Sequence, residues 1–186
     1  MDSETAYFIR EAKHDRNRAL AFLFETYSRK IFKAAYVYFR SQEQAEDICQ
    51  DVFAAASARA SGFRGGSKVY TWLYGIFLNK ARDMMRRQYT EDRAVREKQE
   101  TAGITRSTLL EHDPEELALK EDIRAAVNEA VYTLPEDMKI LIIMRYFEDF
   151  SGKEMASILD MSHARVRSKL SEARAALRGI LIKEHI

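Results

Sequence analysis

The chain has 186 residues, enough for one ordinary domain or two small ones, and its formal net charge of +1 neither requires nor excludes a nucleic-acid partner. Glycine and proline, at 7 and 2 residues, are too scarce for a turn-rich β fold. We expect no membrane insertion, because no apolar stretch approaches the ~18 residues of a membrane span. The start, MDSET, is unlike a signal peptide. The single cysteine, Cys49, favours a reducing cytoplasm.

The first strong periodic signal begins at Leu20. Apolar residues then recur at steps of four and three, which predicts an amphipathic helix with one wide apolar stripe: Leu20, Phe24, Tyr27, Ile31, Ala34 and Tyr38. Ser41 fits the N-cap of a second helix, because Gln44 follows three residues later. The apolar stripe of that helix holds Ala45, Cys49, Val52 and Ala56. Its opposite side is acidic and polar: Glu43, Asp47, Gln50 and Asp51.

A third long helix is expected from about Val69 to Gln88, after a break at Gly65-Gly66. At ~100° per residue, its core-facing side holds Leu73, Phe77, Ala81 and Met84, with Tyr70 and Tyr74 alongside. A polar stripe runs along another side: Thr71, Gly75, Asn79, Arg82 and Arg86. Trp72 lies at the boundary, where a place in the core is favoured over base stacking.

The apolar period fades from Tyr89 to His112, which predicts a polar linker. Asp113-Pro114 then restarts helical structure, with an N-cap, a proline at the first helical position and an acidic first turn. We expect one helix to about Tyr132, another to about Phe147, and two more after that. The predicted fold class is all-α, with two small helical domains at 1–92 and 113–186 joined by a flexible linker at 93–112.

The last two helices have the pattern of a helix-turn-helix. Ser151 and Glu154 are spaced as a capping box, and Phe150 and Met155 as a hydrophobic staple. Asp160 tolerates the left-handed backbone that a tight turn needs, and Ser162 can cap the following helix.

The final helix separates into an apolar side and a side suited to a DNA groove. Its apolar stripe consists of Val166, Leu170, Ala173 and Leu177. Small residues point directly away from that stripe: Ala164, Ser168, Ser171 and Ala175. Cations lie on both flanks: Arg167, Arg174 and Arg178 on one, Arg165 and Lys169 on the other. Small residues let a helix enter the major groove while flanking cations reach the phosphates, so this helix is expected to read DNA.

Enzymatic readings find little support. The four histidines are scattered, without metal-ligand spacing among themselves or with Cys49. The run Gly65-Gly66-Ser67-Lys68 lacks the glycine spacing and the preceding strand of a phosphate-binding loop. No serine or cysteine lies in a nucleophile motif. We therefore predict no catalytic residue, metal or cofactor.

Two parts of the chain resemble conserved regions of the bacterial sigma-70 family. Region 4 is similar to LPEDMKILIIMRYFEDFSGKEMASILDMSHARVRSKLSEARAAL. Region 2 is similar to EQAEDICQDVFAAA followed by FRGGSKVYTWLYGIFLNKARDMMRR. The resemblance covers about residues 18–90 and 113–180. A chain with only these two regions and a linker is similar to the extracytoplasmic-function (ECF) subgroup.

The resemblance implies a bacterial, cytoplasmic, non-enzymatic subunit that recruits core RNA polymerase to promoters. Its region 2 helix would dock on the β′ clamp helices through Asp47, Gln50 and Asp51. The loop formed by Phe63, Arg64, Gly65, Gly66 and Ser67, with the helix face formed by Asn79, Arg82 and Arg86, would read and open the −10 element. Region 4 would sit on the β flap and read the −35 element through Arg165, Arg167, Ser168, Lys169, Ser171 and Arg174. An anti-sigma factor is the expected inhibitor.

The chain departs from the family's usual pattern at a few positions. Ala164-Arg165-Val166 stands where members often have Gly-Thr-Val, Glu172 where a basic residue is common, and Gly75 where Arg is frequent. Glu172 could accept a hydrogen bond from a cytosine amine, pair with Lys169, or weaken phosphate contact. The alternative function is a helix-turn-helix regulator whose N-terminal helices form a sensor or dimerisation domain that does not bind polymerase.

Overall fold

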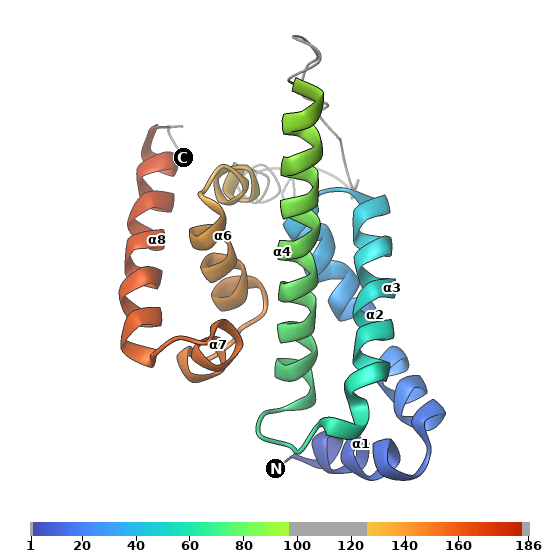
Figure 1. The fold of residues 1–186 in the computed structure, drawn as a ribbon. Helices are drawn as coiled ribbons and strands as arrows, with labels where there is room; N and C mark the ends of the chain where they lie inside the picture. Colours follow the sequence, from blue (N-terminus) through green and yellow to red (C-terminus); the bar gives the residue numbers. More distant parts are fainter. Residues whose placement is uncertain (1, 97–125, 184–186) are drawn as a thin grey trace, which may run out of the picture. The chain divides into compact units, whose positions relative to one another are not determined.

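The computed structural model describes residues 2–96 and 126–183. The chain divides into two compact units, Met1–Ser107 and Thr108–Ile186, called unit 1 and unit 2 below (Figure 1). Every regular element in the described ranges is helical and none is a strand, which confirms the all-α fold class.

The described part of unit 1, residues 2–96, contains four α-helices and one short 3-10 turn. They are α1 (Ser3–His14), α2 (Arg16–Phe39), α3 (Gln42–Arg59), η1 (Ala60–Gly62) and α4 (Val69–Arg96). The side chains of Asp2, Asp15 and Ser41 cap α1, α2 and α3 by accepting hydrogen bonds from backbone N–H groups of the first turn. The Ser41 cap confirms that the helix predicted after Ser41, which is α3, starts where expected.

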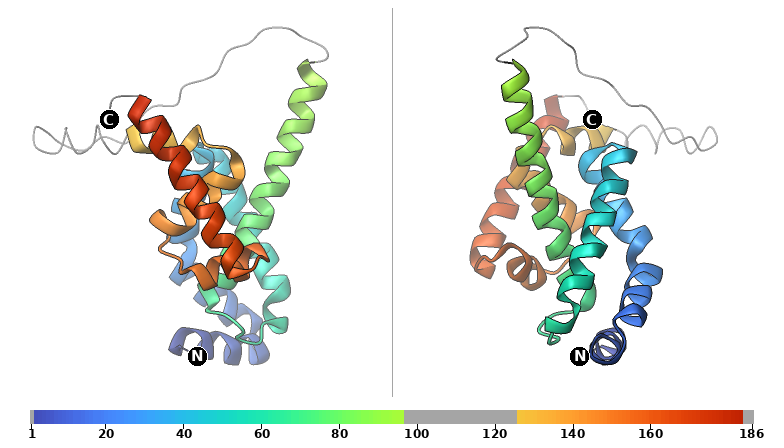
Figure 2. Two further views of the ribbon diagram at one scale, coloured as in Figure 1. Left: turned by 90° about the vertical axis from the view of Figure 1, so that its left-hand side faces the viewer. Right: turned by 45° about the vertical axis from the view of Figure 1, so that its right-hand side comes forward.

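Helix α1 is not among the predicted helices. It lies across one end of the bundle formed by α2, α3 and α4, where the chain turns from η1 into α4 (Figures 1 and 2). Its Phe8 is fully buried, and the Val69 backbone N–H at the start of α4 donates to Thr5 Oγ1 at 3.2 Å. The helix therefore closes the end of unit 1 to which the 63–67 loop is attached.

Two predicted stripes need correction in unit 1. Phe24 is 57% exposed and Leu20 only half-buried, because the first turns of α2 direct Ala19 and Leu23 to the core. From Tyr27 onward the predicted register holds. Thr71 is 3% exposed instead of lying on an open polar stripe, since α1 packs against the start of α4.

Helix α4 also runs beyond the expected end near Gln88, as far as Arg96. No glycine or proline follows Gln88 in this stretch to end the helix.

Unit 2 begins, in the described residues, with a helical segment at 126–132. It continues with α6 (Glu136–Ile142), a π-helical turn η2 (Ile143–Phe147), α7 (Gly152–Leu159) and α8 (His163–Lys183). The predicted restart at Asp113-Pro114 lies outside the described residues. Figure 1 shows α8 alongside α6, with α7 joined to the start of α8 by a short turn. Val166 and Ala173 of α8 are buried, as predicted, while Leu170 and Leu177 are half-buried.

Candidate functional site

The turn between α7 and α8 has the geometry that the sequence predicts. The Ser151 hydroxyl accepts from the Glu154 backbone N–H at 3.3 Å, and a Glu154 carboxylate oxygen accepts from the Ser151 N–H at 2.9 Å. Asp160 ends α7 in the left-handed region, at φ 52° and ψ 50°. Ser162 then caps α8 by accepting from the Arg165 N–H at 3.2 Å. The capping box and the turn of the helix-turn-helix are therefore confirmed.

A close approach between Gly152 and His163 keeps this turn compact. A Cβ atom placed on Gly152 would lie 2.5 Å from Nε2 of the His163 ring, well inside contact distance. Glycine at the first position of α7 therefore lets the imidazole at the first position of α8 rest on its backbone. This contact fixes the start of α8 against α7.

The outward side of α8 is small and basic. Its small side chains are exposed: Ala164, Ser168, Ser171 and Ala175. Arg165, Arg167 and Arg174 are exposed too, and in the described part of the chain no carboxylate pairs with any of them. Three unpaired guanidinium groups around a row of small side chains can contact phosphates while the helix approaches base edges.

Two polar side chains of α8 have partners that the sequence did not reveal. The Lys169 ammonium lies 3.1 Å from Asp137 Oδ2 of α6, so a phosphate contact by Lys169 requires that this ion pair break. The Ser168 hydroxyl donates to Glu172 Oε1 at 3.2 Å.

The 63–67 loop of unit 1 rests on an aromatic cluster. Phe63 is 8% exposed, and its ring centroid lies 5.6 Å from that of Phe8 and 4.9 Å from that of Trp72. Phe63 therefore packs beneath the loop, with its ring against those of Phe8 and Trp72. Trp72 is half-buried in the same cluster, in agreement with its expected place in the core.

In the rest of this loop Arg64 and Gly66 are exposed, and Gly65 and Ser67 are half-buried. Arg64 is exposed and donates from Nη1 to the Ser61 carbonyl at 2.8 Å. Gly65 has a φ of 77°, a conformation that favours glycine, and a Cβ on Gly66 would meet nothing within 4 Å. The Ser67 hydroxyl donates to the Lys68 carbonyl at 3.3 Å. A backbone this free of covering side chains can accept a nucleotide from solution.

The exposed part of the predicted polar stripe of α4 begins at Asn79, about two turns after Thr71. Asn79 and Arg86 are exposed and Arg82 is partly exposed. Arg86 lies 3.9 Å from Asp83 on the helix surface, a contact of little energy in water. These three residues, with the open part of the 63–67 loop, are the surface of unit 1 suited to a nucleic acid.

Helix α3 carries the predicted acidic face, defined as Asp47, Gln50 and Asp51. All three side chains are exposed. Asp51 lies 3.4 Å from Lys80 Nζ of α4, which ties one end of the face to the neighbouring helix.

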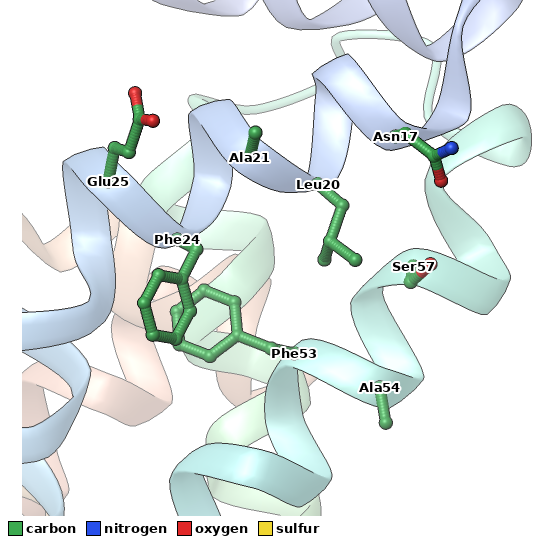
Figure 3. Close-up of a pocket in the computed structure, with 8 residues that line it drawn as sticks. All are labelled: Asn17, Leu20, Ala21, Phe24, Glu25, Phe53, Ala54 and Ser57. Carbon is green, nitrogen blue, oxygen red and sulfur yellow. The ribbon is translucent and has the colours of Figure 1, made fainter.

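An apolar groove adjoins the acidic face along α3. Its walls are residues of α2 and α3: Asn17, Leu20, Ala21, Phe24, Glu25, Phe53, Ala54 and Ser57. Figure 3 shows the Phe24 and Phe53 rings side by side, with a centroid separation of 5.3 Å. Phe24, which belongs to the predicted apolar stripe of α2, is 57% exposed. The groove and the acidic face together form one surface, because Ala54 follows Gln50 by one helical turn.

Cys49 does not have the properties of a reactive thiol. Burial, with the nearby Glu46 carboxylate as a second cause, raises the pKa of Cys49 to about 11. A thiol with so high a pKa is a poor nucleophile near neutral pH. Among the residues that the structure describes, no three His, Cys, Asp or Glu side chains are grouped to hold a metal.

These features define a class of protein: a DNA-binding helix-turn-helix unit linked to a second helical unit with its own polar surfaces. Comparison with known proteins identifies the family. Residues 23–90 match the model of sigma-70 region 2, and residues 124–177 match a model of sigma-70 region 4.

Whole-chain relatives agree with these matches. The ECF RNA polymerase sigma-E factor of Escherichia coli is 31% identical over 166 residues, covering 86% of this chain and 85% of the relative. The RNA polymerase sigma-H factor of Pseudomonas aeruginosa is 28% identical over 173 residues, covering 91% and 89% of the two chains.

Solved structures share the fold. CnrH, solved with the cytosolic domain of CnrY, superposes with a TM-score of 0.70 at 22% identity, covering 98% of this chain and 99% of that one. The sigma factor RpoE of Bartonella quintana, solved with the anti-sigma factor NepR, has a TM-score of 0.68 at 23% identity, covering 85% of this chain and 93% of that one.

The chain belongs to the sigma-70 family and is an ECF sigma factor. It binds core RNA polymerase and directs promoter-specific initiation of transcription, as expected from the resemblance. No helix in the described ranges is long and apolar enough to cross a membrane.

Proposed function

We propose that the acidic face of α3 is the docking surface for the β′ clamp helices, as the sigma-family resemblance implies for Asp47, Gln50 and Asp51. The exposure of these side chains supports the assignment. The apolar groove beside them adds the hydrophobic part that a stable interface needs, with Phe24 as its most exposed ring.

Unit 1 also carries the surface for the −10 element. Arg64, Gly65, Gly66 and Ser67 form the open rim of the loop, and Asn79, Arg82 and Arg86 form the adjoining helix face. A base flipped from the non-template strand would enter this rim, and nearby cations would offset part of the few kcal/mol that flipping costs. Phe63 acts as the support of the rim and does not touch the base.

Helix α8 reads the −35 element from unit 2. The single observation that carries this assignment is the row of small exposed side chains flanked by Arg165, Arg167 and Arg174, none of which has a carboxylate partner in the described residues. Ser168 and Ser171 lie in the row itself. Lys169 contributes chiefly to the packing of α8 on α6 through Asp137.

Family membership supports four further proposals. The protein has no enzymatic activity of its own and acts in the bacterial cytoplasm. Residues 1–92 act as region 2 and 113–186 as region 4, with the residues between them as the linker. An anti-sigma factor holds the free protein inactive, as NepR is named an anti-sigma factor in the complex with the Bartonella protein.

The docking surface is tested by replacing Asp47 and Gln50 together with alanine and measuring co-elution with core polymerase. We expect co-elution to fall at least about tenfold, while Glu129→Ala, an exposed glutamate in unit 2, elutes with core as the native protein does. Full association of the double variant would contradict the assignment.

The −10 surface is tested with Arg64→Ala combined with Gly66→Ala. A Cβ on Gly66 meets nothing within 4 Å, so this variant removes the loop chemistry without strain. We expect core association to persist and the permanganate reactivity of promoter thymines to fall. Unchanged reactivity would exclude a role of this loop in opening the duplex.

A further inference from the structure

Glu172 is out of place on the basic helix α8. It is the one acidic residue among residues 163–183. Its side chain is exposed, on the side of α8 that carries the small residues. At ~100° per residue it lies ~40° around the helix from Ser168, at the edge of the row proposed to face the base edges and on the same side as Arg165.

Glu172 does not form the ion pair with Lys169 that its position on the helix suggests. Lys169, three residues earlier, is well placed for a pair on the helix surface, but its ammonium lies 3.1 Å from Asp137 on α6. No other cation of the described residues pairs with Glu172. The Glu172 carboxylate would therefore keep its negative charge in a complex with DNA, where it would repel nearby phosphates.

Its only hydrogen bond in the described structure comes from Ser168, whose hydroxyl donates to Glu172 Oε1 at 3.2 Å. A serine hydroxyl has one proton, and here that proton is used within the helix. The pair consequently presents acceptors alone to whatever lies in front of it: the second carboxylate oxygen and the lone pairs of the hydroxyl. The hydrogen bond also restricts the rotamers of Glu172, which reduces the entropy lost on binding.

An all-acceptor pair discriminates among base edges in the major groove. Cytosine offers the N4 amine as a donor. Adenine offers the N6 amine beside the N7 acceptor. Guanine offers only the acceptors N7 and O6, and thymine offers O4 and a methyl group. A carboxylate therefore favours cytosine, tolerates adenine and is repelled by guanine and thymine.

We propose that Glu172, oriented by Ser168, is a specificity residue of this sigma factor that selects cytosine at one position of the −35 element. The inference rests on the proposed function of α8 in −35 reading. Ser168 acts in it as a positioning residue.

The test uses the full chain with core polymerase and a pool of promoters randomised across the −35 element. Transcribed templates are sequenced for the native protein and for Glu172→Ala, Glu172→Gln and Ser168→Ala. At one −35 position, the native protein should enrich cytosine over guanine at least about fivefold. Glu172→Ala should lose that enrichment, and Ser168→Ala should reduce it.

Glu172→Gln should change the preferred base instead of abolishing the preference. Its amide can bond adenine N6 and N7 together, so the preferred base at that position should change from cytosine to adenine. Glu129→Gln, the same change on an exposed glutamate outside α8, should keep the native preference.

The possible failures are distinct. Native protein that initiates from no template in the pool would overturn the proposed function, and this inference with it. Native protein that initiates, with a −35 profile unchanged by Glu172→Ala, would overturn the inference and leave the proposed function standing.

Discussion

The ring of Phe8 in α1 lies 5.6 Å, centroid to centroid, from the ring of Phe63, the first residue of the 63–67 loop. Phe8 is fully buried and Phe63 is 8% exposed. The N-terminal helix therefore packs against the first residue of the proposed −10 loop and supports it. Loss of this packing should affect both the stability of unit 1 and the opening of promoters.

Phe8→Ala should lower the free energy of unfolding by about 3–5 kcal/mol, the usual cost of deleting a fully buried phenylalanine side chain. Urea titration followed by circular dichroism measures the change. Tyr7→Ala serves as the control on the same helix, because Tyr7 is 39% exposed and its loss should cost much less. Equal stability of the Phe8 variant and the native protein would mean that α1 does not pack as described.

Gly152→Ala should destabilise the helix-turn-helix by about 1–3 kcal/mol, since the new Cβ would lie 2.5 Å from His163 Nε2. Adding His163→Ala should recover much of the loss, and a double-mutant cycle of thermal unfolding measures the coupling. Gly179→Ala is the matched control: no atom lies within 4 Å of its Cβ, and alanine inside a helix should stabilise by up to about 1 kcal/mol. Additive effects of the first two changes would contradict the contact.

Arg167 and Lys169 should differ in how they respond to salt. Arg167 has no carboxylate partner in the described structure, so Arg167→Ala should reduce the slope of log affinity against log salt for holoenzyme on promoter DNA by about one. Lys169 is held by Asp137, so Lys169→Ala should change that slope much less. Filter binding at several salt concentrations measures both slopes. Equal reductions would show that Lys169 leaves Asp137 for the phosphates.

Cys49 should be slow to react and should tie stability to high pH. With the thiol pKa raised from 9.0 to about 11, the thiolate fraction at pH 8 falls about 100-fold, and alkylation of the native protein should slow accordingly. Between pH 9 and pH 11 the Cys49 thiol keeps its proton in the folded state and loses it in the unfolded chain. The contribution of this thiol to the free energy of unfolding is therefore fully present below pH 9 and declines as the pH rises toward 11.

Cys49→Ala isolates that contribution. The difference in the free energy of unfolding between the native protein and this variant should shrink between pH 9 and pH 11, because the variant has no thiol to titrate. Alkylation of native Cys49 at the rate of a small free thiol would contradict the burial that raises its pKa.

The fold was largely predictable wherever its signals are local. The caps at Ser41, Ser151 and Ser162 and the left-handed Asp160 depend on neighbours within three or four residues, which the sequence displays directly. The outward row of α8 follows from helical periodicity alone, and its exposure is as expected.

What the sequence could not supply depends on contacts between distant segments. Asp137 reaches Lys169 across 32 residues, and Phe8 reaches Phe63 across 55, so neither partner is visible in a local pattern. Phe24 fits an apolar period equally well from inside the core or from the rim of a groove, and only the packing of α2 on α3 decides between them. The sequence does contain a signal for α1, namely the Asp2 cap and the apolar residue Phe8. Two such residues are too few to predict a helix.

The most direct test of the sigma assignment is transcription from a reconstituted holoenzyme. Core RNA polymerase, the full chain and fragmented DNA from the source genome are combined, and transcript 5′ ends are mapped with and without the chain. We expect defined new start sites that share sequence elements near −10 and −35 and that disappear when Asp47 and Gln50 are replaced together. A chain that binds duplex DNA tightly alone, never associates with core polymerase and creates no start site would contradict it, and would favour a helix-turn-helix regulator instead.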